Sequence, residues 1–142
     1  MPVRNRLIAR SAVAVVVVAT IAGCAQAEMA PRKAARLTID GNTHNTRPPA
    51  CTQDQSYRTI DIRDHYGRVE AVVLLSGDRA ILQWVKIRNV DGFTGSFWDG
   101  GVGDADVDLA KNTYTITGSA YGINDSHPNK VVTTDFKIIA DC

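Results

Sequence analysis

The pattern of apolar and polar positions divides the chain into three parts. Residues 1–23 begin with positive charge and continue as an almost wholly apolar stretch, and residues 25–36 are small and polar with one proline. From residue 37 onward apolar and polar positions alternate, and β-branched residues dominate. Alternation with a period of two residues is typical of half-buried strands. We therefore expect a folded domain in residues 37–142, after a leader (1–23) and a linker that begins at Cys24 (24–36).

Short apolar runs predict the individual strands of this domain. Residues 57–63 alternate between apolar and polar side chains. Residues 69–75 are apolar except for Glu70, a run that we interpret as a strand buried on both faces, although a short buried helix gives the same pattern. Residues 81–88 alternate again, and a regular strand there puts Leu82 on the face opposite Val85. Further runs occur at residues 93–98, 113–121 and 131–140.

Turn residues separate these runs at short intervals. Glycine and asparagine tolerate positive φ, and proline fixes φ, so that clusters of these residues favour tight turns. Such clusters occur at Asp40-Gly41, Tyr66-Gly67, Ser76-Gly77-Asp78, Asp91-Gly92, Asp99-Gly100-Gly101, Lys111-Asn112 and Pro128-Asn129. No segment shows a convincing helical period. The sequence therefore predicts an all-β fold, an antiparallel sandwich or barrel-like sheet of about seven or eight short strands.

Two of the predicted strands contain a glycine at the same place. Residues 93–98 and 116–121 both have the pattern apolar-Thr-Gly-Ser, with Gly95 and Gly118 in mid-strand. A glycine inside a strand often marks a bulge or a close approach of two backbones. Two copies do not make a repeat architecture, and we interpret them as recurring strand composition.

The leader has the organisation of a secretory signal. Arg4, Arg6 and Arg10 precede an apolar stretch over residues 11–21, and small residues follow it. A positive region, a short apolar region and small residues before a cleavage site are typical of such signals. A membrane-spanning helix needs about 20 apolar residues, which is more than this stretch supplies.

The end of the leader indicates lipidation. Ile21, Ala22, Gly23 and Cys24 look like a bacterial lipobox, in which cleavage occurs between Gly23 and Cys24. The Cys24 thiol is a soft nucleophile that can form a thioether with a diacylglycerol, and the freed amine can take a further acyl chain. One acyl chain holds a protein only marginally, whereas two hold it stably. We expect a lipid anchor on the extracytoplasmic side of the cell membrane; the alternative is an ordinary signal peptide with a chance cysteine.

Charge limits the classes of partner. The chain has 16 Lys and Arg against 15 Asp and Glu, and removing the three leader arginines leaves 13 against 15. A mature part with a small negative balance does not fit a nucleic-acid partner, which requires a clustered basic surface, and it also argues against a polybasic membrane patch. Within the linker, Arg32, Lys33 and Arg36 could contact anionic headgroups. The linker is interpreted as a tether, with a short docked helix as the alternative.

Cys51 and Cys142 are the remaining cysteines. An even pair in an exported protein is expected to be oxidised, so we predict a Cys51–Cys142 disulfide. A catalytic or metal-binding thiol is the alternative, but neither cysteine has a histidine or second cysteine at ligand spacing.

The sequence predicts no catalytic residue, metal site or cofactor. Residues 99–108 are rich in aspartate and glycine, which could indicate a weak calcium site. However, Asp104, Asp106 and Asp108 alternate with apolar residues, and a strand with one solvated acidic face explains them. There is no serine nucleophile motif, and we interpret the scattered histidines as surface or turn residues. These histidines are His44, His65 and His127.

The assembled residues resemble the LpqH-type surface lipoprotein antigens of mycobacteria, and the LppE-like members in particular. The resemblance runs from about residue 37 to residue 142, and its marks are residues 37–41, Cys51, residues 89–92, residues 114–122 and residues 136–142. It implies a cell-envelope antigen without known enzyme activity. It also implies recognition by the host Toll-like receptor 2, which reads the acylated cysteine that maps onto Cys24. The Ser- and Thr-rich glycosylated linker of better-known members is missing, because residues 25–36 contain neither residue.

Three functional hypotheses follow. The first is a membrane-anchored antigen that displays a folded β domain and interacts with the host through its lipid. The second is a binding or carrier module for a small apolar ligand such as an envelope lipid, with residues 72–75, Trp84 and Trp98 as the apolar lining. The third is a hydrolase, for which the sequence assembles no nucleophile, base and orienting group.

Overall fold

A computed structural model describes residues 32–142, which form one antiparallel sheet of ten strands and contain no helix. Consequently no helix in this part of the chain has the length and hydropathy to span a membrane. The strands are β1 (Arg36–Ile39), β2 (Asn42–Asn45), β3 (Ala50–Asp54), β4 (Tyr57–Asp64), β5 (Gly67–Ser76), β6 (Arg79–Val90), β7 (Phe93–Trp98), β8 (Asp104–Ala110), β9 (Thr113–Asn124) and β10 (His127–Asp141).

The sheet is open and has two free edges. Its hydrogen-bonded order is β2-β1-β10-β9-β7-β6-β5-β4-β3, and β8 pairs with β9 outside this path. Two strands pair with the same side of β9: its residues 121–124 pair with β7, and its residues 113–119 pair with β8. The all-β, antiparallel prediction is confirmed. The sheet does not close into a barrel, since β2 and β3 end the path without pairing with each other.

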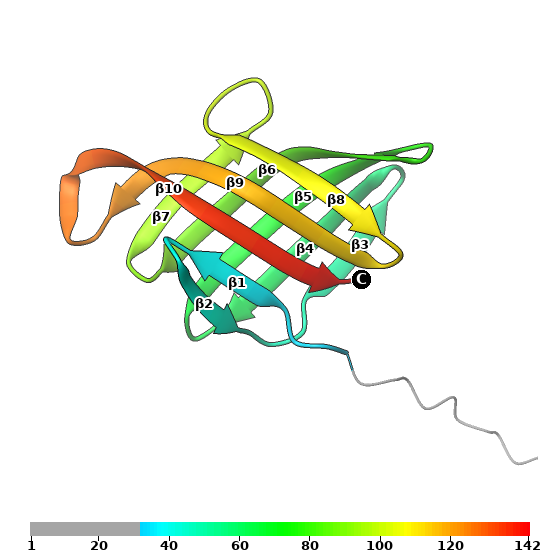
Figure 1. The fold of residues 1–142 in the computed structure, drawn as a ribbon, viewed down its shortest axis with the longest axis horizontal. Helices are drawn as coiled ribbons and strands as arrows, with labels where there is room; N and C mark the ends of the chain where they lie inside the picture. The colour runs from blue at the N-terminus through cyan, green and yellow to red at the C-terminus, as the bar shows by residue number, and fades with distance from the viewer. Residues whose placement is uncertain (1–31) are drawn as a thin grey trace, which may run out of the picture. The chain divides into compact units, whose positions relative to one another are not determined.

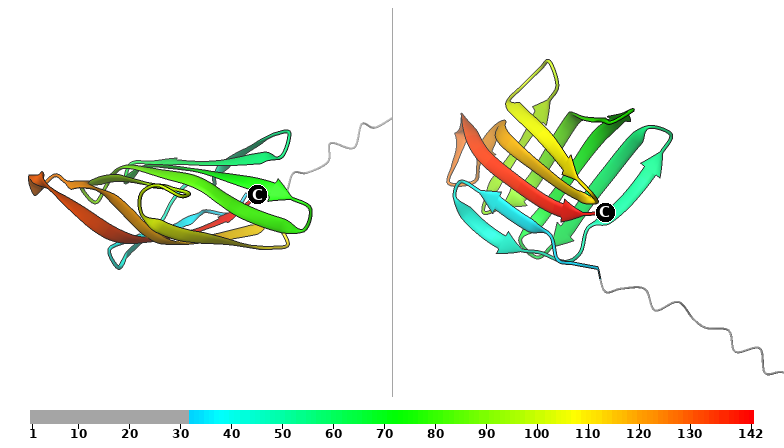
Figure 2. Two further views of the ribbon diagram at one scale, coloured as in Figure 1. Left: turned by 90° about the horizontal axis from the view of Figure 1, so that it is seen from above. Right: turned by 45° about the vertical axis from the view of Figure 1, so that its right-hand side comes forward.

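The sheet folds back on itself and forms two layers. Strands β1, β10, β9 and β8 lie in front of β4, β5 and β6 in Figure 1, and Figure 2 shows the two layers from above. The inward faces of both layers form one apolar core, which includes fully buried side chains from β1, β4, β5, β6, β7, β9 and β10. The largest of them are Phe93, Leu37, Ile39, Ile60, Ile62, Ile87, Ile116 and Ile138.

The structure contains more strands than the seven or eight that the sequence predicts. The strands without a predicted run include β2 and β3, whose sequences NTHN and ACTQD are largely polar. Both are edge strands that pair with one neighbour only, so that main-chain hydrogen bonds form them without an apolar face. Strand β1 begins at Arg36, and Ala35 before it is fully buried.

Three further predictions are corrected by the register of the sheet. Residues 69–75 are not buried on both faces, because Val72 and Leu74 face outward and are only half-buried. Leu82 lies on the same face as Val85, because a bulge adds one residue to β6 between the pairs Val73–Leu82 and Val72–Trp84. Residues 128–129 do not form the last turn. They belong to β10, within an interruption of its pairing with β9.

Glycines allow β9 to approach its two neighbours closely. Gly122 pairs with Gly95 of β7, and Gly118 pairs with Ala105 of β8. A Cβ atom on Gly122 would overlap the Thr94 carbonyl oxygen and the Gly95 Cα, and one on Gly118 would overlap the β8 backbone. The mid-strand glycines therefore mark close backbone approaches between β9 and its two neighbours, β7 and β8.

A charged cluster stabilises the outer face of β4 and β5. Asp61 accepts hydrogen bonds from Arg68 Nε at 2.9 Å and from Arg63 Nε at 2.8 Å, and Arg68 also bonds Glu70 at 2.8 Å. Partial burial raises the pKa of Asp61, but the hydrogen bonds and charges of both arginines outweigh this effect and hold the pKa below its ordinary value of 3.8.

We predict that Gly122→Ala lowers the free energy of unfolding by about 1–3 kcal/mol, because the backbone of β7 has to move to admit the methyl group. The measurement is urea denaturation followed by tryptophan fluorescence. Gly101→Ala is the milder comparison and should cost less stability, since its φ is not positive and its new Cβ would make one tight contact, 3.3 Å to Trp98 Cβ, without overlapping a backbone atom. Equal stability of the Gly122→Ala variant and the wild type would contradict the assigned register.

We also predict that the Asp61 cluster contributes to acid stability. The folded pKa lies below the unfolded one, so the contribution is complete above the ordinary value of 3.8 and is lost as the pH falls through the lower folded pKa. Asp61→Asn should remove at most about 1 kcal/mol at neutral pH and flatten the stability profile below about pH 5. Asp54→Asn, at an exposed carboxylate, should keep the wild-type slope. An unchanged slope in Asp61→Asn would disprove the contribution.

Candidate functional site

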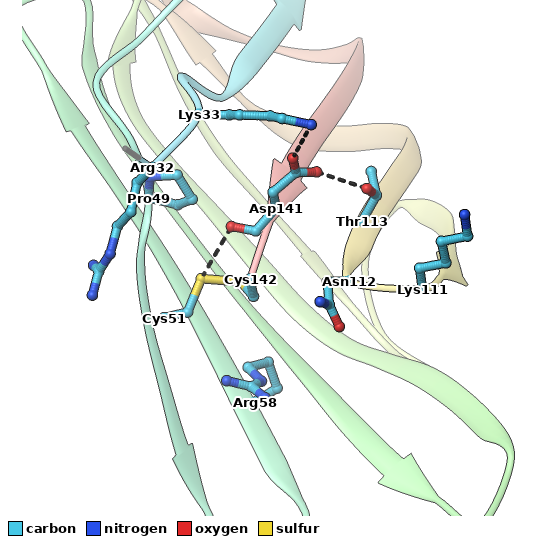
Figure 3. Close-up of a pocket in the computed structure, with 10 residues that line it drawn as sticks. All are labelled: Arg32, Lys33, Pro49, Cys51, Arg58, Lys111, Asn112, Thr113, Asp141 and Cys142. Atoms are coloured by element: carbon cyan, nitrogen blue, oxygen red, sulfur yellow. Dashed lines mark hydrogen bonds and ion pairs between the residues drawn. A yellow bond between two sulfur atoms is a disulfide. The ribbon is translucent and has the colours of Figure 1, made fainter. Parts of the chain in front are cut away.

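The candidate site is a depression at the end of the sheet where the described residues begin (Figure 3). It has a volume of about 480 Å³ and is open to solvent. It lies between the segment before β1, the start of β3 and β4, the β8–β9 turn and the end of β10. The residues that line it are Arg32, Lys33, Pro49, Cys51, Arg58, Lys111, Asn112, Thr113, Asp141 and Cys142.

A disulfide joins the two layers in this depression. Cys51 belongs to the edge strand β3, and Cys142 follows β10 of the other layer. Their Cα atoms are 5.8 Å apart, and 91 positions separate them in the sequence. The amide of Cys142 also donates a hydrogen bond of 2.8 Å to the Asn112 carbonyl. The covalent link therefore holds the edge of one layer against the centre of the other.

Asp141 is held in its charged form at one side of the depression. The Thr113 hydroxyl donates a hydrogen bond of 2.7 Å to Asp141 Oδ1, and Lys33 Nζ lies 3.5 Å from Oδ2. The hydrogen bond from Thr113, followed by the charge of Lys33, lowers the pKa of Asp141 below its ordinary value of 3.8. Lys33 is thus partly neutralised, although its side chain is largely exposed.

The other three cations of the depression lack such a partner. Arg32, Arg58 and Lys111 make no ion pair with any residue in the part of the chain that the structure describes. The Arg58 Nε atom is also buried without a hydrogen-bond acceptor among those residues. A buried donor without an acceptor is unfavourable. The depression therefore combines excess positive charge with an unsatisfied donor, and it suits an anion.

A second cluster brings histidines and aspartates together. His44 Nε2 of β2 lies 2.8 Å from Asp91 Oδ2 in the β6–β7 turn, and the His44 ring stacks on Tyr66 with centroids 4.2 Å apart. Asp64 and His65 are in contact as well, because they lie where β4 ends and the turn begins. Histidine and carboxylate can act as base and orienting group, but no serine, threonine or cysteine bonds either histidine within residues 32–142.

The acidic run forms strand β8 and part of the loop before it. Asp104, Asp106 and Asp108 are exposed, while Ala105 and Val107 pack against the core. Among residues 32–142, no group of three histidine, cysteine, aspartate or glutamate side chains is placed to hold a metal ion. Acidic and apolar residues alternate along β8 because one face of the strand is in solvent and the other packs on the core.

The residues expected to line an apolar cavity lie on two different faces of the sheet. Val73 is buried in the core, but Val72 pairs with Trp84 and Trp84 with Trp98 on the outer face. The Trp98 side chain is 46% exposed, and Lys86 Nζ lies 4.5 Å from the centre of the Trp84 ring. These side chains form an outer aromatic surface and do not line one cavity together.

Sequence reasoning found only part of the depression. It selected Cys51, Cys142 and the linker cations, but it missed Arg58 and Lys111, which no motif connects to them. Only the long-range pairing of the sheet brings these two cations to the same place. Gly23 and Cys24, the predicted cleavage and lipidation positions, lie outside the described residues.

Comparisons with known proteins find a family and several relatives that are all described as mycobacterial lipoproteins. A family described as "Mycobacterium 19 kDa lipoprotein antigen" matches residues 28–142. The protein named "Probable lipoprotein LppE" of Mycobacterium tuberculosis is 66% identical over 138 residues, which cover 97% of this chain and 99% of that protein. A "Putative lipoprotein" of Mycobacterium avium is 33% identical over 141 residues, covering 99% of this chain and 98% of its own length. A "Putative lipoprotein" of Mycobacterium indicus pranii is also 33% identical, over 108 residues.

We predict that loss of the disulfide lowers the free energy of unfolding by about 4–5 kcal/mol, since its long loop restricts the unfolded chain strongly. The variant is Cys51→Ser/Cys142→Ser, compared with the wild type by urea denaturation. The reduced wild type should match the variant, and a reductant should leave the variant unchanged. A wild-type protein that is equally stable with and without reductant would refute the prediction.

Proposed function

The chain belongs to the Mycobacterium 19 kDa lipoprotein antigen family, and on that premise we propose that it is cut between Gly23 and Cys24 and anchored by acyl chains on Cys24. The anchored protein would be a cell-envelope lipoprotein antigen on the extracytoplasmic side of the cell membrane. The observation that carries this proposal is the position of Cys24, directly after an apolar leader that ends in Ile21, Ala22 and Gly23.

The chemistry of the anchor follows from the cysteine. Its sulfur forms a thioether with a diacylglycerol, and cleavage frees an amine that can be acylated. A diacylglycerol brings two acyl chains, which meets the requirement for stable attachment. From Cys24 to Arg32 the extended backbone reaches at most about 28 Å, so the folded part would stay near the membrane surface.

We assign the host-directed activity to the lipid rather than to the sheet. In this proposal Toll-like receptor 2 binds the acylated Cys24, and residues 32–142 form a folded domain displayed beside it. Relatives that are named as lipoproteins, in a family described as an antigen, support a non-enzymatic role. The disulfide supports a protein built for an oxidising compartment outside the cytoplasm.

We predict that Cys24→Ala moves the protein, expressed in a mycobacterial host, from the detergent phase to the aqueous phase in detergent partitioning. Without acyl chains the protein loses its apolar anchor. The same variant should fail to activate a reporter cell that carries Toll-like receptor 2. The Cys51→Ser/Cys142→Ser variant is the matched control, because it also loses cysteines but should keep the anchor. Retention of Cys24→Ala in the detergent phase with full reporter activity would overturn the proposal.

A further inference from the structure

We infer that the depression at the disulfide binds the phosphate of an anionic phospholipid headgroup, and that it places this end of the domain on the membrane. We call Arg32, Lys33, Arg58 and Lys111 the cationic pocket (Figure 3). The location of the membrane in this inference rests on the proposed anchor. The affinity for an anion rests on the described residues alone.

The charge balance of the pocket favours an anion. Four cationic side chains line it, but Asp141 supplies the one carboxylate side chain among the lining residues, so that positive charge is in excess. This excess is local, because the sequence after the leader has the opposite balance of 13 basic against 15 acidic residues. Elsewhere on the sheet, Arg63 and Arg68 already have carboxylate partners.

The donors of the pocket match a phosphate group. Arg58 comes from β4, and its Nε atom is buried without an acceptor in the described part of the chain. A guanidinium presents its donors in a planar fork that fits phosphate oxygens, and charge-assisted bonds of this kind are stronger than neutral ones. Lys111, on the β8–β9 turn, adds a compact charge, and Asn112 lines the same depression. The guanidinium of Arg58 lines this depression and would direct its donors to a phosphate oxygen bound there.

The anchor brings the pocket to such headgroups. Arg32, the first described residue, itself lines the pocket, and Cys24 lies at most about 28 Å away along the extended chain. Attraction of a cation to an anionic bilayer falls off within a Debye length of about 10 Å, so the pocket gains affinity only when it rests on the headgroups. The tether is long enough to allow this contact and too short to carry the domain far away.

The acidic strand β8 defines the orientation of the domain on the membrane in this inference. It leads into Lys111, and its exposed aspartates lie between Asp108, roughly 10 Å from Lys111 along the strand, and Asp104, roughly 23 Å from Lys111. An anionic surface repels these carboxylates. Contact through the pocket, with the Asp104 end pointing away from the bilayer, separates the acidic face from the headgroups.

The test is amide hydrogen exchange on the lipidated protein in vesicles. We compare vesicles of phosphatidylcholine alone with vesicles that also contain phosphatidylglycerol. The expected result is slower exchange at residues 111–113 only when phosphatidylglycerol is present. In Arg58→Gln/Lys111→Gln, each charge removed should reduce the docked population about fivefold. High salt should also reduce the docked population of the wild type.

The matched control is Arg88→Gln/Lys130→Gln, which removes one arginine and one lysine that are exposed elsewhere on the sheet. This control should keep the wild-type protection. Equal protection in both vesicle types, or equal loss in both double variants, would overturn the inference. Protection by inorganic phosphate in vesicles of phosphatidylcholine alone would also overturn it, because the ligand would then be free phosphate.

A second arm separates this inference from the anchor. The Cys24→Ala chain, which has no acyl group, is mixed with the same vesicles at high lipid concentration. Binding that requires phosphatidylglycerol and is lost in Arg58→Gln/Lys111→Gln supports the pocket even if the wild-type protein proves to be unlipidated. A lipidated wild type without this binding leaves the anchor intact and refutes the pocket.

Discussion

A sheet that has one apolar face and no helix to cover it must bury that face against itself. In this domain the alternation of side chains puts the apolar residues of seven strands on one side, and the sheet folds back until its two halves enclose them. The fold depends on β9, which pairs with β10 along its length and changes its second partner from β8 to β7. Gly118 and Gly122 permit the close approaches that this change requires. The disulfide then ties the β3 edge to the end of β10, where an open sheet would otherwise separate.

The sequence predicted those parts of the fold that depend on local patterns. Alternation identified the strands with an apolar face, and the leftover pair of cysteines indicated the link that the structure contains. It missed β2 and β3, because edge strands with polar side chains are specified by the neighbour to which they bond. It put Leu82 on the wrong face, because a single bulge residue inverts the alternation. Arg58 and Lys111 meet only through the topology of the sheet, so no local pattern could have brought them together.

The same constraints connect the fold to the proposed role. The end of the sheet that carries the disulfide is also where the chain arrives from Cys24. Burial, main-chain pairing and the covalent link each stabilise the domain, which suits a module displayed outside the cell. Three cations without an ion-pair partner among the described residues, Arg32, Arg58 and Lys111, lie at this end, while the exposed aspartates of β8 extend away from it. Charge is therefore distributed unevenly over the domain: the end at the disulfide carries cations that suit anionic headgroups, and the Asp104 end of β8 carries carboxylates that suit solvent.

The most direct test of the account is the intact mass of the protein extracted from mycobacterial membranes, measured before and after reduction. The account predicts a chain that begins at Cys24 and carries the mass of a diacylglycerol and further acyl groups. Reduction should add the mass of two hydrogens, from the Cys51–Cys142 bond. A chain without acyl mass, or one that begins at another residue, would contradict the anchor. A mass unchanged by reduction would contradict the covalent link between the layers.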